Sequence, residues 1–118
     1  MEVKYYVDKS GKSPFDEWLE SIKDKSIQNR LLKEITKLEL GLLGDPKSVG
    51  GGLYEKRIKF STAYRIYYGY HNKEIIILLS GSSKDGQKKE IKKAHEYWDD
   101  FKKRQTTTKG GMVNEKSK

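Results

Sequence analysis

The sequence contains no cysteine. This absence excludes disulfides, thiolate zinc sites and a cysteine nucleophile, and a domain of this size can fold without any of them. No stretch approaches the roughly 20 apolar residues that a membrane-spanning helix needs, and Met1–Ser10 has no apolar core of signal-peptide length. We therefore expect a cytoplasmic protein that has no membrane partner.

Histidine is also scarce, and the two histidines lie far apart in the chain. His71 falls beside an expected turn and His95 on an expected helix, so they show neither the pairing of metal ligands nor a catalytic triad. The segment Gly81–Gly86 has too few glycines and the wrong spacing for a nucleotide-binding P-loop. The sequence therefore predicts no metal site and no cofactor.

Positive charge, in contrast, is plentiful in this chain of 118 residues, a length that fits a single domain. Lysine and arginine number 25 against 17 aspartates and glutamates, which gives a formal net charge of +8. Such a charge favours a polyanionic partner through attraction and counterion release, although it can also serve solubility alone. Charge by itself does not decide between these two interpretations.

The first part of the chain predicts a strand followed by a helical hairpin. Val3–Val7 is rich in β-forming residues. Ser13 and Pro14 are the residue types that start a helix, and a second start lies at Asp24–Ser26. Apolar residues follow at helical spacing, namely Phe15, Trp18, Leu19 and Ile22 in the first helix and Ile27, Leu31, Leu32, Ile35 and Leu38 in the second, which Gly41 ends.

The second part of the chain predicts a sheet and a final helix. After a glycine-rich loop over Leu43–Gly52, the runs Leu53–Phe60, Tyr64–His71 and Glu74–Gly81 predict an antiparallel meander. The final helix carries Ile91, Ala94, Trp98 and Phe101 on one stripe. We expect an α+β fold over residues 1–104, in which a three-stranded meander completes a four-stranded sheet with the N-terminal strand. Residues 105–118 are expected to form a disordered tail.

A β-hairpin gathers cations on one face of this sheet. If Ser61–Ala63 is the connector, Lys59 lies opposite Arg65 and Arg57 opposite Tyr67. These four side chains share one face, and Ile58, Phe60, Tyr64 and Ile66 share the other. Like charges placed directly opposite destabilise a sheet, so the pairing of Lys59 with Arg65 indicates an anion shared between them. The alternative is an ordinary solvated face that Glu55 partly neutralises.

The next hairpin extends the cationic face. Asn72-Lys73 has the residue types of a two-residue turn, which sets Tyr67 opposite Leu78 and Arg65 opposite Ser80. The face then runs towards the loop that carries Lys84. This mixture of cations and an aromatic suits contacts with phosphates and bases.

Several segments together form a family pattern. They are Ser13–Leu19 (SPFDEWL), Gly52–Ile58 (GLYEKRI), Tyr64–Tyr68 (YRIYY), Leu79–Lys84 (LSGSSK), Gln87 and Tyr97-Trp98. On these residues the stretch from Val3 to Arg104 resembles the RelE/ParE superfamily of bacterial toxins, in particular its phage-derived, HigB-like addiction-module killer branch. The resemblance implies a RelE-like fold and a toxin of a type II toxin–antitoxin system. It further implies that the protein cuts mRNA in the ribosome without a metal ion.

The resemblance also implies site residues and partners. Matched by motif, the expected catalytic residues are Arg57, Arg65, Lys84 and Tyr67, and the expected RNA-binding residues are Lys59, Lys56 and Tyr64. The expected partners are mRNA, the ribosome and a cognate antitoxin, commonly a helix-turn-helix protein. Members of this family usually end at a position that corresponds to about Arg104, so the resemblance assigns no role to residues 105–118.

Metal-free RNA cleavage uses the substrate's own 2′-OH as the nucleophile, so the protein must stabilise a dianionic phosphorane and move two protons. Arg57 and Arg65 suit the first task, because their guanidinium groups bind phosphate in a fork. Tyr67 could stack on a base or transfer a proton, but no histidine falls on this face and the proton carriers stay open. Two alternatives remain for the same fold, a ParE-like DNA gyrase inhibitor and a binding module without catalysis.

Overall fold

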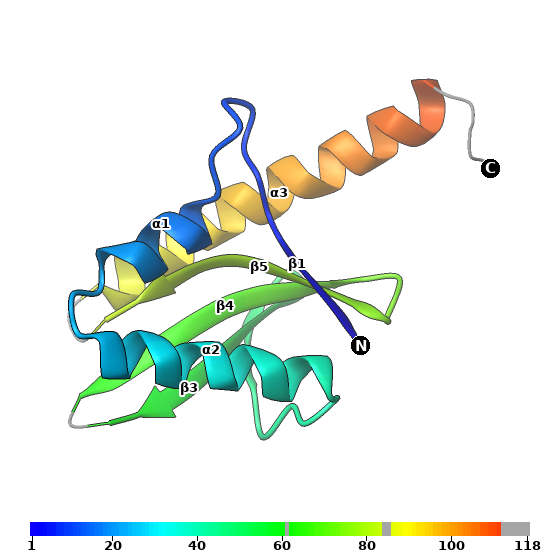
Figure 1. The fold of residues 1–118 in the computed structure, drawn as a ribbon. Helices are drawn as coiled ribbons and strands as arrows, with labels where there is room; N and C mark the ends of the chain where they lie inside the picture. The colour runs from blue at the N-terminus through cyan, green and yellow to red at the C-terminus, as the bar shows by residue number, and fades with distance from the viewer. Residues whose placement is uncertain (61, 84–85, 112–118) are drawn as a thin grey trace.

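A mixed five-stranded sheet with helices on both faces forms the structure (Figure 1). The computed structural model describes residues 1–60, 62–83 and 86–111, the last six by their backbone alone. In chain order the elements are β1 (Glu2–Tyr5), α1 (Pro14–Ser21), α2 (Lys25–Glu39), β2 (Lys47–Gly50), β3 (Leu53–Lys59), β4 (Ala63–His71), β5 (Ile75–Ser82) and α3 (Gln87–Gly111). The strand order is β1-β5-β4-β3-β2, with β1 parallel to β5 and the other neighbours antiparallel. The predicted α+β class and the order of the elements are confirmed.

Strand β2 forms where a loop was expected, so the sheet has five strands rather than four. Its pairing with β3 begins at Lys47 opposite Glu55, and a bulge precedes Gly50. Gly50, Gly51 and Gly52 have φ angles of 91°, 64° and 85°, a left-handed conformation that glycine adopts without steric cost. The glycines therefore make a tight reversal, and the reversal brings a weakly β-forming segment alongside β3.

The first two helices pack on one face of the sheet, as their apolar stripes predict. The Ser13 hydroxyl caps α1 by accepting from the Asp16 backbone N–H at 3.1 Å. Asp24 caps α2 by accepting from the Ser26 N–H at 2.9 Å. Their buried residues pack with the sheet residues Ile58, Ile66, Tyr68, Ile76 and Leu78. Leu32 differs from the expectation, because it lies at the margin of the stripe and is 43% exposed.

Two glycines of the sheet receive tryptophans from opposite faces. A Cβ atom at Gly81 would lie 2.3 Å from the Trp18 ring of α1, and one at Gly69 would lie 2.7 Å from the Trp98 ring of α3. Both distances are shorter than carbon atoms can approach, so these positions need glycine. Trp98 also donates from Nε1 to the Gly51 carbonyl at 3.0 Å. Helix α3 is thereby fixed across the face opposite to α1 and α2.

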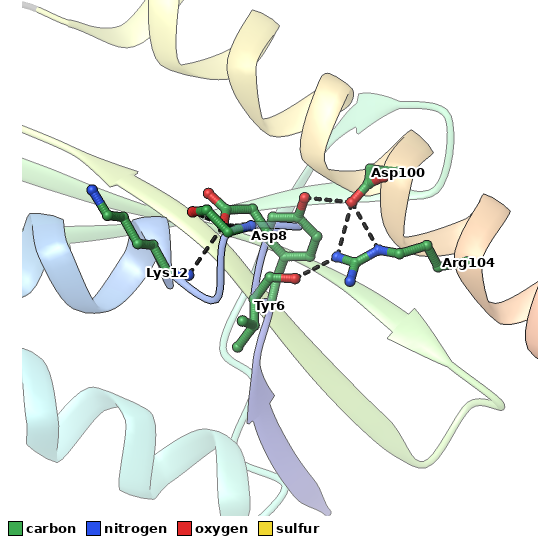
Figure 2. A network of polar contacts seen from close by, with 7 residues as sticks. Tyr6, Asp8, Lys12, Asp100 and Arg104 are labelled. Carbon is green, nitrogen blue, oxygen red and sulfur yellow. Dashed lines mark hydrogen bonds and ion pairs between the residues drawn. The ribbon is translucent and has the colours of Figure 1, made fainter.

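Further along α3, polar contacts tie the helix to the segment after β1 (Figure 2). The Tyr6 hydroxyl donates to Asp100 at 2.6 Å, and Asp100 pairs with Arg104 at 2.8 Å. The Arg104 guanidinium also donates to the Val7 carbonyl. These contacts hold β1 beside β5 and under α3.

The backbone of α3 continues to Gly111, whereas disorder was expected from residue 105 onwards. No proline interrupts residues 105–109, so the helix projects beyond the sheet until it reaches two glycines (Figure 1). Residues 112–118, the rest of the expected tail, lie outside the described residues. Neither α3 nor any other helix in the described part of the chain is long and apolar enough to cross a membrane.

Candidate functional site

The β3–β4 hairpin brings Arg57 directly opposite Arg65, with Lys59 opposite Ala63 and Glu55 opposite Tyr67. The predicted pairing of Lys59 with Arg65 and of Arg57 with Tyr67 was wrong. The connector begins one residue earlier than expected, because the Phe60 backbone N–H donates to the Thr62 carbonyl at 3.0 Å and closes the turn there. The register differs by two residues, and a shift of two keeps every side chain on its predicted face.

The β4–β5 hairpin also differs from the predicted register. Asn72 and Lys73 have φ angles of 56° and 66°, as a primed turn requires, but His71 pairs with Ile75 and the connection is longer than two residues. A bulge between Tyr67 and Tyr68 then shifts the pairing again. As a result Tyr67 lies opposite Ser80 and Arg65 opposite Ser82, in place of the predicted Leu78 and Ser80.

Two neighbouring rows of side chains therefore cross the sheet on the face that α3 partly covers. We call the set Arg57, Arg65 and Ser82 the arginine row. The second row contains Glu55, Tyr67 and Ser80. Because paired residues of adjacent strands point to the same face, both rows belong to the face that the sequence marked as cationic.

The arginine row passes from solvent towards the interior. Arg57 is exposed, as is Lys59 beside it on β3, and neither has an ion-pair partner among the described residues. Arg65 is mostly covered, with 14% of its side chain exposed, and its Nε lies 3.8 Å from Glu55 Oε2. That Nε has no hydrogen-bond partner within the described structure. The row thus presents one exposed and one mostly covered arginine side by side.

Glu55 links the arginine row to the start of α3. Its side chain is only 5% exposed, and its Oε2 accepts a hydrogen bond from Gln87 Nε2 at 2.9 Å. Gln87 is the first residue of α3, so this contact fixes where the helix begins over the sheet. The carboxylate also balances part of the charge of Arg65 from the buried side.

Tyr67 does not stand on the open surface, contrary to expectation. Its side chain is fully buried beneath α3 in a cluster with Leu53, Leu79 and Trp98. The hydroxyl lies 3.0 Å from Ser82 Oγ. Burial raises the pKa of Tyr67 to about 12, so the phenol keeps its proton at neutral pH.

Two of the three expected RNA-binding residues lie on the opposite face of the sheet. Lys56 is buried against α2, with its Nζ 3.6 Å from Glu34 Oε1. Tyr64 is half-buried, with its ring 5.2 Å from that of Phe60 and 6.5 Å from that of Trp18. Only Lys59 shares the face of the arginine row. Lys84, the remaining expected catalytic residue, lies outside the described residues.

A cleft of about 560 Å³ adjoins the arginine row at the end of β5. Its floor is the strand end Ser80–Ser82, and its walls come from α1, through Trp18, and from α3, through Lys93 and Tyr97. Ser82 belongs to both the row and the cleft, so the two features are continuous. Within the described residues no group of three or more His, Asp or Glu side chains is arranged to hold a metal ion.

Residues 17–99 match the family described as phage derived protein Gp49-like. The chain belongs to this family. The Gp49-like family is part of the RelE/HigB-like toxin superfamily, in agreement with the resemblance seen in the sequence motifs. The matched range contains β3, β4, β5 and the first half of α3, so the whole arginine row lies within the part that is typical of Gp49-like proteins.

A protein of Haemophilus influenzae, described as uncharacterized, is 39% identical to this Gp49-like chain over 80 residues. The aligned part covers 68% of this chain and 81% of the relative. At this identity and coverage the two chains share the family.

Sequence reasoning missed three residues that shape the candidate site: Glu55, Gln87 and Ser82. Glu55 was noticed only as a neutralising charge, although its spacing of two from Arg57 places both on one face. Gln87 was part of the recognised pattern, but nothing in a single sequence shows that it bonds to a residue on β3. Ser82 lies opposite Arg65 because a bulge shifts the β4–β5 register, and no local turn signal predicts that bulge.

Proposed function

We propose that this Gp49-like protein is the toxin of a type II toxin–antitoxin system and acts as a ribosome-dependent mRNA endonuclease that needs no metal ion. The observation that carries the proposal is the direct pairing of Arg57 with Arg65, next to exposed Lys59. Two like charges directly opposite are unfavourable in an isolated sheet, and an anion placed between them removes the repulsion. A phosphodiester of RNA is such an anion.

The proposed reaction is an attack of the 2′-OH on the adjacent phosphorus. The O2′–P bond forms and the P–O5′ bond breaks, which leaves a 2′,3′-cyclic phosphate and a 5′-hydroxyl. The 2′-OH gives up one proton and the departing O5′ takes one. The charge on phosphorus-bound oxygens rises in the transition state, and the guanidinium groups of Arg57 and Arg65 stabilise it through charge-assisted hydrogen bonds.

Tyr67 is unsuited to the proton transfers, because it is enclosed beneath α3 and its pKa is raised to about 12. The protein's own contribution is then chiefly electrostatic. Ribosomal RNA would hold the mRNA in place and so reduce the entropic part of the barrier. This division of labour explains why the proposed activity depends on the ribosome.

Mapping of mRNA ends in a translation extract tests the proposal. The wild type should produce new 5′ ends within translated codons, and Arg57→Ala should abolish them at the same protein dose. Lys33→Ala, which removes an exposed lysine of α2, is the matched control and should cut as the wild type does. Intact mRNA at doses that stop translation would contradict the proposal.

Two other results would assign a different role. DNA breaks and inhibited supercoiling, with mRNA intact, would identify a ParE-like gyrase inhibitor. Absence of growth arrest on induction would identify a binding module. In the proposed system, co-expression of the cognate antitoxin, expected to be a helix-turn-helix protein, restores growth.

A further inference from the structure

The cleft at the end of β5 lies along a free strand edge. β1 pairs with β5 only as far as Tyr5 opposite Leu78, and the last bond is from the Tyr6 N–H to the Leu78 carbonyl at 2.9 Å. β5 itself runs on to Ser82. Beyond Leu78, the described residues therefore supply a strand neighbour on the β4 side alone, and the cleft occupies the other side between α1 and α3.

A buried hydroxyl on the cleft floor is left without a partner. Ser80 is 2% exposed, lines the cleft, and its Oγ makes no hydrogen bond within the described structure. Buried polar side chains are nearly always hydrogen-bonded, so an unpartnered one calls for an explanation. A ligand that enters the cleft and hydrogen-bonds to Ser80 provides it.

The charges of the cleft indicate which part of a nucleotide fits. Glu17 from α1 and both Glu90 and Lys93 from α3 line it, and Glu90 pairs with Lys93 at 3.6 Å, so Glu17 is left as a lining carboxylate without an ion-pair partner among the described residues. Carboxylates repel a phosphate but accept hydrogen bonds from the amino and imino groups of a base. Trp18 and Tyr97 add aromatic surface, which favours a flat apolar ring. These features suit a nucleobase, while the phosphate remains at the arginine row.

The proposed chemistry also needs a place for one base. In-line attack of a 2′-OH on the neighbouring phosphorus cannot occur in the stacked helical conformation, so one base beside the scissile phosphate must leave the stack. Ser82 connects the arginine row to the cleft, which puts the cleft one strand away from Arg65. A base that unstacks from a phosphate bound at Arg57 and Arg65 therefore has this cleft within reach.

We propose that the cleft between α1 and α3 binds a nucleobase adjacent to the scissile phosphate and that Ser80 recognises the edge of this base. The inference rests on the proposed ribonuclease function and extends it to substrate selection. It makes Ser80 a specificity residue that acts on the base and leaves the phosphate contacts to the arginine row.

The chain's two tryptophans allow a direct binding test. Trp18 forms a wall of the cleft. Trp98 of α3 packs against Gly69 of the sheet and donates its indole N–H to the Gly51 carbonyl, so it serves as an internal control. The probes are 2′-O-methyl dinucleotides, which cannot be cut, and analogues in which one nucleotide lacks its base. Titration of the full chain is followed by the two indole N–H signals in NMR spectra.

We expect the dinucleotides to shift the Trp18 signal and leave the Trp98 signal unchanged, and we expect the abasic analogues to leave both unchanged. Ser83→Phe, which places a ring at the exposed rim of the cleft, should abolish the Trp18 shift. Ser48→Phe, at an exposed serine on the opposite edge of the sheet, should retain it. Ser80→Ala should keep the thermal midpoint, because it removes an unpartnered group, and should reduce discrimination among bases about tenfold.

Three results would overturn the inference: a silent Trp18 signal, an equal shift with the abasic analogues, or an unchanged shift in Ser83→Phe. A Trp18 shift produced by an acidic peptide but by no dinucleotide would also overturn it and assign the cleft to a protein partner. The mRNA-end mapping decides the proposed function separately. If mRNA is cut but no dinucleotide shifts the Trp18 signal, only the proposal of a base-binding cleft is wrong. If the Trp18 signal shifts in a base-dependent way but mRNA is not cut, only the proposed nuclease activity is wrong.

Discussion

Two buried carboxylates lie on opposite faces of the sheet, and each accompanies a cation of the hairpin. On the α2 face, Glu34 lies 3.6 Å from Lys56 and 3.0 Å from Lys37. On the α3 face, Glu55 lies 3.8 Å from Arg65 and accepts its hydrogen bond from Gln87. Glu55 and Lys56 are adjacent in the chain, so alternation along β3 sends them to different faces.

The difference between the two pairs lies in what remains unsatisfied. Lys56 is enclosed by α2 and matched by Glu34, and its face contains no other cation of the hairpin. Arg65 keeps an unpartnered Nε, and the exposed Arg57 lies directly opposite. The matched pair of Lys56 with Glu34 stabilises the fold, whereas exposed Arg57 and the 14% of the Arg65 side chain that reaches solvent remain available to contact an anion. The comparison therefore separates an ion pair that is enclosed on all sides from one that lies beside exposed cations, and we propose a function only for the second.

The largest expected effect is the loss of mRNA cleavage when an arginine of the arginine row is removed. Arg65→Ala should reduce mRNA cleavage about 10²–10³-fold, the usual cost of removing one donor to a transition-state oxyanion. Arg57→Ala should behave alike, and Arg57→Lys should recover little, because lysine cannot form the fork. Initial rates of mRNA cleavage on translating ribosomes give the measurement. If Arg65→Ala cut at the wild-type rate while folded, the two ion pairs would be equivalent and the comparison would fail.

On the structural side, Glu34→Ala should lower the free energy of unfolding by about 3 kcal/mol, because it leaves Lys56 buried without a counter-charge. Urea unfolding measures this loss. The double variant Glu34→Leu, Lys56→Met should recover most of the stability, since apolar residues of similar volume replace the pair. It should also cut mRNA normally. Loss of cleavage in a stable double variant would return Lys56 to the RNA-binding role that the sequence suggested.

Glu55→Gln tests whether the buried carboxylate of Glu55 orients Arg65 for the proposed reaction. The change keeps a partner for Gln87 but removes the charge that orients Arg65. We expect kcat to fall about tenfold, the equivalent of roughly 1.4 kcal/mol, while KM does not rise, because Arg65 is freer to bind phosphate but less well placed. Single-turnover cleavage rates at varied mRNA concentration separate the two constants. A raised KM with unchanged kcat would show that Glu55 acts only on binding.

Much of this arrangement could be predicted because it depends on local patterns. Ser13 and Asp24 start helices as their chemistry requires, and alternation puts Arg57 and Lys59 on one face of β3, a face that Arg65 shares in every register shifted by an even number of residues. The predicted β3–β4 register was wrong by two residues, which changed the partner of each side chain but left each side chain on its predicted face. The face on which each hairpin side chain lies was therefore more predictable than its partner on the next strand.

What could not be predicted depends on tertiary contacts. Helix α3 covers part of the cationic face because Trp98 fits over Gly69, and Tyr67 is buried beneath this helix. The bulge beside Tyr67 aligns Ser82 with Arg65, although neither residue signals a bulge. Lys56 looked like one of several surface cations, and only its pairing with Glu34 of α2 shows that it is enclosed.

The smallest expected effect concerns Tyr67 and its pH dependence. Burial raises its pKa from 10 to about 12, so folding favours the protonated phenol. This stabilisation is complete below pH 10 and is lost as pH rises from 10 towards 12, because the unfolded chain releases the proton first. We expect a loss of about 1 kcal/mol by pH 11 in urea unfolding, and a smaller loss in Tyr67→Phe. Tyr6, whose pKa is also raised to about 12, still titrates in that variant, so the difference between the two curves isolates Tyr67. The proposed mechanism gives the buried phenol no part in proton transfer, so cleavage by Tyr67→Phe should follow the wild-type pH profile below pH 9. A displaced profile would place Tyr67 in the chemistry after all.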